Sequence, residues 1–149
     1  MLSAPPRDSR GEIEPHDHLG IRNTDGVIRR ISTQQTVLDP KIGGWRLSSL
    51  AVAPSSGVNG GMSVDLPREI ESAGHDAKAY VSTPPSIGSI LFVAEHFRNQ
   101  SLMVGHDPLP TNPHHGQVWG KFSKSKQNTL SKVATWLVPI ADVVLCVKK

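Results

Sequence analysis

Two adjacent histidines, His114 and His115, follow a proline-rich run and come shortly before a cluster of lysines. Imidazole titrates near neutral pH, so either ring could act as a general acid or base. In an extended chain neighbouring side chains point to opposite sides, so at most one of them is expected to face a given pocket. The alternative is a polar loop in which one imidazole bonds a backbone carbonyl. A loop stiffened by Pro110 and Pro113 is a common place for function.

Positive charge is concentrated directly after these histidines. No acidic residue occurs between Asp107 and Asp142, whereas the chain as a whole carries a net charge of +3. The same interval holds four lysines: Lys121, Lys124, Lys126 and Lys132. It leads into an expected helix start, where free backbone amides favour an anion. The pattern predicts a site for a phosphate-bearing ligand, a nucleotide or RNA; the alternative is a solvated, lysine-rich turn.

Arginines on two predicted strands could complete this site. Histidine moves protons, and Arg and Lys stabilise the charge that develops on phosphorus, so such a set suits phosphodiester cleavage without a metal. The hypothesis assigns catalysis to His114, His115 and Arg46. It assigns ligand binding to Arg29, Lys121, Lys124, Lys126 and Ser49. The alternative is that the strand arginines are exposed and form ion pairs with Asp39, Asp65 or Glu residues.

Metal binding is a weaker hypothesis. His16 with His18, or His106 with Asp107 and His114, could supply nitrogen and oxygen ligands for zinc. The sequence contains no His-Glu-x-x-His motif, no cysteine pair and no Gly-x-x-x-x-Gly-Lys-Ser/Thr loop. We therefore assign no metal ligands and no cofactor, and NTPase chemistry is unsupported.

A non-catalytic protein–protein interaction or assembly module is the main alternative to a phosphate-binding enzyme or binder. It predicts an exposed apolar patch or a free sheet edge. Under either hypothesis the oligomeric state stays open, and the protein partner, if there is one, is not identified by any motif.

Composition predicts one small domain. The chain has 149 residues, of which 37% are hydrophobic and 5% aromatic, enough for one core built mainly of aliphatic side chains. The single cysteine, Cys146, excludes an internal disulfide and is expected to be a buried thiol. No stretch approaches the roughly 18 apolar residues of a membrane span, and the first residues lack the apolar region of a signal peptide. A cytoplasmic protein that does not enter a membrane is expected.

Strands and short helices mix without a regular β-α-β period, which predicts an α+β fold. We expect a compact single domain with a mixed or mainly antiparallel sheet of about five or six short strands and three short helices. Residues 1–24 show no apolar period and are predicted as a flexible N-terminal tail. Residues 25–149 are predicted as the single globular domain.

Local signals place the elements. Pro67 and Glu69 predict a helix over about residues 66–73. Residues 89–99 are expected as a helix, although the apolar run from Ile90 to Val93 also fits a buried strand. Another helix is expected over 128–138. Strands are expected at 26–33, 45–55, 62–64, 78–83, 101–108, 116–122 and 140–149.

Overall fold

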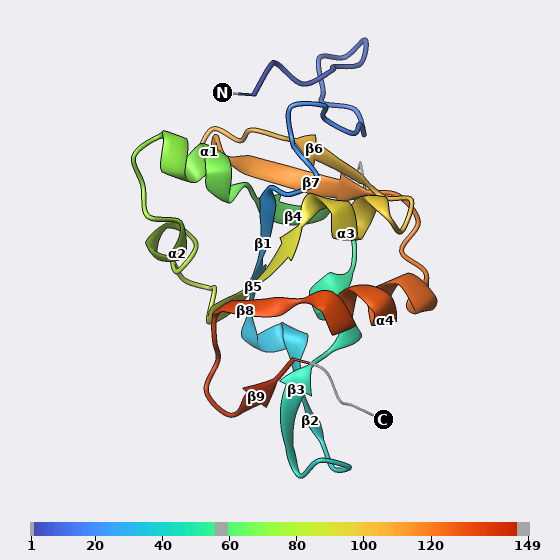
Figure 1. The fold of residues 1–149 in the computed structure, drawn as a ribbon, viewed down its shortest axis with the longest axis vertical. Coiled ribbons are helices and arrows are strands. Elements are labelled where there is room, and N and C mark those ends of the chain that lie inside the picture. Colours follow the sequence, from blue (N-terminus) through green and yellow to red (C-terminus); the bar gives the residue numbers. More distant parts are fainter. Residues whose placement is uncertain (1, 56–59, 146–149) are drawn as a thin grey trace.

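The computed structural model describes residues 2–55 and 60–145 and confirms the α+β class. Its main sheet is antiparallel, with the strand order β6-β7-β4-β1-β5-β8 (Figure 1). These strands are β1 (Gly26–Ile31), β4 (Met62–Asp65), β5 (Gly88–Val93), β6 (Met103–His106), β7 (His115–Trp119) and β8 (Thr135–Val138). A second sheet joins β2 (Thr36–Asp39), β3 (Gly44–Leu47) and β9 (Val143–Val144). The β2–β3 hairpin projects from the lower end of the domain in Figure 1.

Helices cover both faces of the main sheet. The α-helices of the described ranges are α1 (Pro67–Ser72), α2 (Ala77–Tyr80), α3 (Ala94–Arg98) and α4 (Lys124–Val133). Two 3-10 helices are η1 (Thr33–Gln35) and η2 (Ser49–Val52). The central strand β1 is buried on both sides. Its Val27 and Ile31 join the larger core with α3, α4 and η2, and its Ile28 joins a smaller core with α1 and α2.

The prediction of a helix over residues 89–99 is wrong in its first half. Residues 90–93 belong to β5, which pairs with β1 along its whole length, from Gly88 with Ile31 to Val93 with Gly26. β8 pairs along the other edge of β5. A strand between two others has its backbone groups satisfied on both sides and both faces covered, so a continuous apolar run suits it. Only α3, from Ala94, is helical.

Three further elements differ from the prediction, and in the first two a polar side chain caps a helix that was expected as part of a strand. The expected strand at 78–83 is α2, where the Asp76 carboxylate accepts from the N–H of Ala79. The expected strand at 45–55 ends at Leu47, and the Ser48 hydroxyl caps η2. The last helix begins earlier than expected, at Lys124, and residues 135–138 form β8 instead of continuing it.

Of the C-terminal strand predicted over 140–149, the described part, which ends at residue 145, forms β9 over Val143–Val144, which pairs in parallel with β3. Cys146, with its expected buried thiol, lies outside the described residues.

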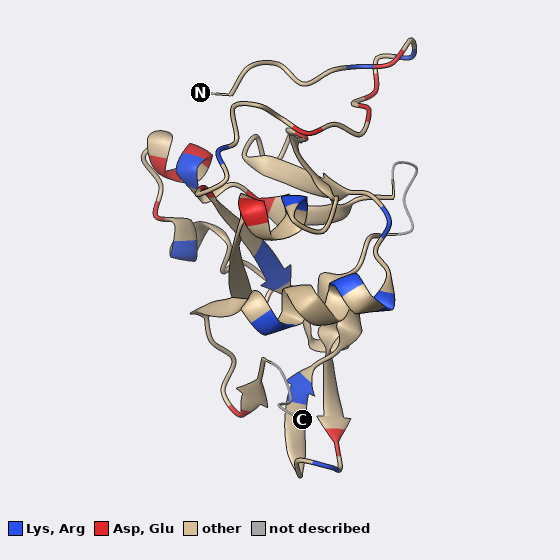
Figure 2. Ribbon diagram, turned by 45° about the vertical axis from the view of Figure 1, so that its right-hand side comes forward, with Lys and Arg blue, Asp and Glu red and all other residues tan. Residues whose placement is uncertain are grey.

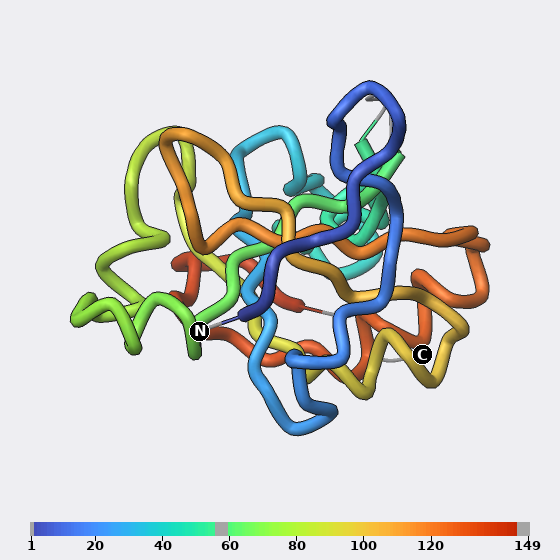
Figure 3. Tube along the Cα trace, turned by 90° about the horizontal axis from the view of Figure 1, so that it is seen from above, coloured from blue at the N-terminus to red at the C-terminus, as the bar shows by residue number. Residues whose placement is uncertain are grey.

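The first residues, predicted as a tail, lie across the top of the domain over β6 and β7 (Figures 1 and 3). The side chain of Ile21 is buried in the larger core, and that of Ile13 is also buried. The backbone N–H of His18 donates to the carbonyl of Val104 in β6, at 2.9 Å. This segment therefore docks on the sheet through both apolar and backbone contacts.

Candidate functional site

The acid-free interval becomes α4 and the connection that precedes it. Ser123 caps the helix, because its hydroxyl accepts from the backbone N–H of Lys126 at 3.2 Å. The N–H groups of the helix's first turn that the cap leaves unbonded point outward from its start. Figure 2 shows Lys and Arg colour, and no Asp or Glu colour, on α4 and on the connection from β7. Lys121, Lys124 and Lys132 are exposed, and Lys126 is half-buried.

No side chain in the described ranges neutralises the charges of these lysines. Among the described residues, every ion pair uses an arginine or a histidine, and none uses a lysine. The arginine pairs are Arg30–Asp65, Arg46–Asp39, Arg68–Asp25 and Arg98–Asp17. The positive charge of α4 is therefore available to a ligand, whereas the charge of these arginines is largely used inside the fold.

The 3-10 helix η2 packs against the first turns of α4. The Gln127 amide donates to the carbonyl of Val52 at 2.9 Å and approaches that of Ser49 at 3.5 Å. Ser49 itself is exposed. The structure thus brings Ser49 to the flank of the lysine-bearing helix, as a shared site requires.

Two arginines of the hypothesis have structural partners instead. Arg29 donates to the carbonyls of Ala51 and Ser63, at 3.0 and 2.9 Å, and so ties η2 to β4. Burial lowers the pKa of Arg29. Arg46 lies in the small sheet, where its Nε is 2.8 Å from the carboxylate of Asp39.

The two histidines diverge and lie away from the lysines. The ring of His115 is buried, and its Nδ1 lies 2.8 Å from the carbonyl oxygen of Asp107. The ring of His114 lies against Tyr80, with centroids 5.5 Å apart. His115 is the first residue of β7, whereas Lys121 lies two residues beyond the last residue of β7, Trp119. A strand rises about 3.3 Å per residue, so these two ends of β7 are about 13 Å apart. The structure does not bring the histidines and the lysines into one cleft.

A buried polar cluster lies near His114; the sequence offered Asp65 as a partner for a strand arginine, but the parts of Asn112 and Tyr80 were missed. Asp65, only 3% exposed, accepts from Arg30 through both carboxylate oxygens, at 2.8 and 3.1 Å. Asn112 donates to the same carboxylate at 2.8 Å and accepts from the hydroxyl of Tyr80 at 2.6 Å. Strand alternation was a further signal, because it turns Arg30 to the opposite face of β1 from Arg29.

Electrostatics in this cluster favour the protonated tyrosine. Burial raises the pKa of Tyr80, and the charge of Asp65 raises it further, while Arg30 opposes both. The guanidinium of Arg30 lies 5.9 Å from the centre of the Tyr80 ring. Tyr80 therefore acts as a hydrogen-bond donor at neutral pH. The two charges of the cluster, on Arg30 and Asp65, are paired with each other.

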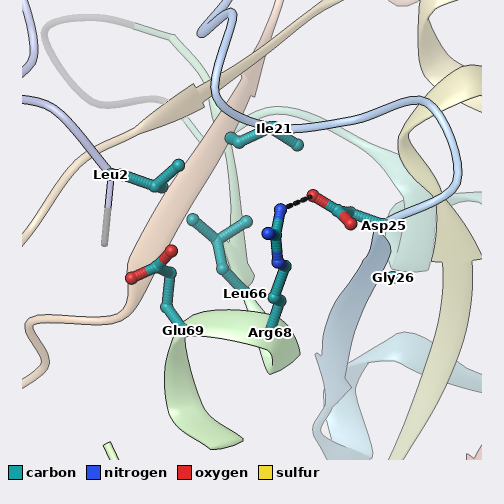
Figure 4. A pocket seen from close by; sticks show the side chains of 7 residues that line it. All are labelled: Leu2, Ile21, Asp25, Gly26, Leu66, Arg68 and Glu69. Carbon is teal, nitrogen blue, oxygen red and sulfur yellow. Dashed lines mark hydrogen bonds and ion pairs between the residues drawn. The ribbon is translucent and has the colours of Figure 1, made fainter. Parts of the chain in front are cut away.

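A small hollow lies between the N-terminal segment and α1 (Figure 4). Its floor is apolar, formed by Leu2, Ile21 and Leu66, and the Arg68–Asp25 ion pair spans its rim at 3.3 Å. The hollow has room for about one water molecule.

Within residues 2–55 and 60–145, no group of three or more His, Cys, Asp or Glu side chains is placed to hold a metal ion. The same residues contain no helix that is long and apolar enough to cross a membrane. No family model, curated protein or solved structure matches the chain.

Proposed function

We propose that this protein binds a phosphate-bearing polymer, RNA in the first instance, through the lysines of α4 and the preceding connection. The observation that carries the proposal is that Lys121, Lys124 and Lys132 are exposed and form no ion pair among the described residues, in an interval free of acidic residues. Unpaired lysines attract phosphate without reading sequence.

The shape of the basic surface supports a polymer over a single nucleotide. Lys124 and Lys132 are eight positions apart on α4, which corresponds to about 12 Å along the helix axis. Lys121 extends the charge beyond the helix start. Several phosphates in a row match such a line of charge better than one compact phosphate group does.

The proposal is one of binding, without catalysis. The proton carriers of the initial hypothesis, His114 and His115, are at the far end of β7, and Arg46 is paired in the small sheet. Catalysis by these three residues stays a prediction without geometric support. Arg29 supports the site indirectly, because it ties η2, which packs against α4, to β4. Lys126 and Ser49 flank the exposed lysines.

The test is fluorescence anisotropy with a labelled, single-stranded 20-nucleotide RNA at several KCl concentrations. If three lysines each neutralise one phosphate, the slope of log K against log salt is about −2, at about 0.7 per phosphate. The triple variant K121A/K124A/K132A is expected to lose at least tenfold in affinity at 50 mM KCl and most of this slope.

A matched control removes the same charge elsewhere. Arg10, Lys41 and Lys78 are exposed and lie in other segments, so R10A/K41A/K78A has the same net charge as the test variant. Its affinity is expected to stay within about threefold of the wild type. Absence of RNA binding at 50 mM KCl, or an equal loss in the control, would refute the proposal.

A specific observation favours a second function, a protein–protein contact on the β2–β3 hairpin. Leu38 and Trp45 are directly paired across the two strands and are 57% and 46% exposed. Ile42, in the turn between them, is 40% exposed. A projecting hairpin with an exposed tryptophan has the composition of an interface hot spot. The variant L38T/W45T tests this, because it keeps strand-forming residues and removes the apolar pair.

The readout for this second function is sedimentation velocity over a range of protein concentrations. Concentration-dependent self-association of the wild type that the L38T/W45T variant lacks would support the hairpin as a contact between copies. A wild type that stays monomeric up to about 200 μM, well above a typical micromolar Kd, would count against it.

A further inference from the structure

The outer edge of β6 is covered by the N-terminal segment. β6 is the terminal strand of the main sheet, so the N–H and C=O groups on its outer side have no neighbouring strand. Residues 16–18, with the sequence His-Asp-His, lie along this edge and bond those groups. We call residues 14–20 the strap.

Three hydrogen bonds hold the strap to the edge, and two of them use side chains. The backbone N–H of Val104 donates to the Asp17 carboxylate at 2.9 Å, and the carbonyl of Val104 accepts from the N–H of His18 at 2.9 Å. The N–H of His106 donates to Nε2 of His16 at 3.2 Å. The sequence pattern that resembled a metal-binding pair is therefore a cap for a strand edge.

Arg98 of α3 braces the strap. Its Nε lies 3.0 Å from the Asp17 carboxylate, and its Nη2 donates to the carbonyl of His18 at 3.1 Å. A third donor, Nη1, reaches the side-chain oxygen of Asn23 at 2.8 Å. The negative charge of Asp17 is thus already balanced by a guanidinium and is not free to stabilise a protonated imidazole.

The hydrogen bonds require His16 and His18 to be neutral. In His16, Nδ1 donates to the carbonyl of Glu14, which leaves Nε2 as the acceptor for β6. In His18, Nδ1 accepts from the N–H of Gly20, and Nε2 donates to the carbonyl of Ser3. Protonation would place a second N–H on each ring, directed at a backbone N–H. Each protonation therefore removes one bond of the strap and introduces a repulsion.

A third imidazole adds to this cost. The ring of His106 lies 6.2 Å from that of His18, and His16 lies 5.9 Å from His18. Burial lowers the pKa of His106; the hydrogen bond to Pro113 and the charge of Glu69 oppose this, and the two neighbouring histidines reinforce it. Three imidazoles so close together disfavour one another's positive charge.

We propose that the strap covers the edge of β6 at neutral pH and leaves it in mild acid, when His16 and His18 become protonated. The geometric basis is that the acceptor nitrogens of both rings face backbone N–H groups, which a protonated ring could not accept from. The uncovered edge then presents the N–H groups of Val104 and His106 to solvent. This proposal is independent of RNA binding by α4, which lies on a different part of the chain.

The experiment is amide hydrogen exchange by NMR at pH 7.5 and pH 5.5, expressed as protection factors so that the intrinsic pH dependence of exchange cancels. The protection factors of the Val104 and His106 amides are expected to fall at least tenfold at pH 5.5. Amides of the central strand β1 are expected to keep theirs. Unchanged protection at Val104 and His106, or an equal loss throughout β1, overturns the proposal.

Two variants test the assignment to these histidines. Glutamine presents an acceptor near the position of Nε2, and asparagine presents one near that of Nδ1, so H16Q/H18N keeps both acceptors but cannot be protonated. Its protection at Val104 and His106 is expected to change less than twofold between the two pH values. The control H75Q changes an exposed histidine and is expected to behave as the wild type. A tenfold fall in the protection factors of Val104 and His106 that persists in H16Q/H18N overturns the proposal. If these two amides are unprotected in H16Q/H18N at both pH values, the substitutions have displaced the strap, and the fall or constancy of the wild-type protection factors supports or overturns the proposal.

Discussion

Nδ1 of His115 lies 2.8 Å from the carbonyl oxygen of Asp107 and 3.2 Å from its carboxylate. The same carboxylate accepts from the side-chain amide of Gln117 at 2.6 Å. Asp107, in the loop that follows β6, is thereby bonded to two side chains of β7, those of His115 and Gln117. Burial raises the pKa of Asp107, but the hydrogen bonds from His115 and Gln117, with the nearby histidine charges, outweigh it and leave the pKa below its ordinary value.

The Asp107→Asn variant should be less stable than the wild type at pH 7, by about 1–2 kcal/mol, because a charged acceptor is replaced by a neutral one. A carboxylate with a lowered pKa stabilises the fold above its unfolded pKa and loses this effect as the pH falls through the folded value. The difference between variant and wild type should therefore shrink below about pH 3.9. Urea unfolding at pH 7 and pH 3 measures it, and a difference that grows in acid would contradict the explanation.

The polar cluster around Asp65 should depend on Asn112 more than on the hydroxyl of Tyr80. Asn112→Ala removes the donor to the Asp65 carboxylate and the acceptor of Tyr80 together, so a loss of about 2–3 kcal/mol is expected. Tyr80→Phe removes one hydrogen bond and should cost about 1 kcal/mol. Urea unfolding of both variants gives the comparison. Equal losses would mean that the carboxylate contact contributes nothing.

Arg29 should matter for stability and not directly for RNA. Arg29→Met leaves the carbonyls of Ala51 and Ser63 without their donor, and a loss of about 1–3 kcal/mol is expected. Lys124→Ala should show the reverse, with unchanged thermal unfolding and weaker RNA binding. Calorimetry and anisotropy on the two variants measure both quantities. A folded Arg29→Met protein that has lost RNA affinity as severely as the triple lysine variant would instead place Arg29 at the ligand.

Helix α4 should depend on its cap. Ser123→Ala removes the acceptor for the N–H of Lys126 and is expected to destabilise the protein by about 1 kcal/mol. The control Ser125→Ala, two residues further and exposed, should be neutral or slightly stabilising because alanine is the better helix former. Thermal unfolding of the two variants distinguishes a cap from a general serine effect.

The preferences of neighbouring residues were sufficient to predict those helices and strands whose sequences carry clear start, stop or strand-forming residues. The β-branched run of β1 and the proline and acidic residue at the start of α1 were read correctly, since these preferences depend only on near neighbours. The divergence of His114 and His115 followed from strand alternation alone. The apolar run of residues 90–93 was misread because a buried strand and a buried helix have the same composition, and only pairing with β1 distinguishes them.

The sequence by itself determined where the charge is: an interval from Asp107 to Asp142 with four lysines and no acid between them. Only the tertiary structure decided which residues meet. His16 bonds the backbone of His106, 90 residues away, and Asn112 reaches Asp65 across 47 residues. Such contacts depend on strand order and on which edge is left open, and these are properties of the whole sheet. The net charge of a segment is the sum of the charges of its residues, so the sequence alone gives it. A binding site is formed by packing that brings residues distant in sequence together, so it requires the tertiary structure.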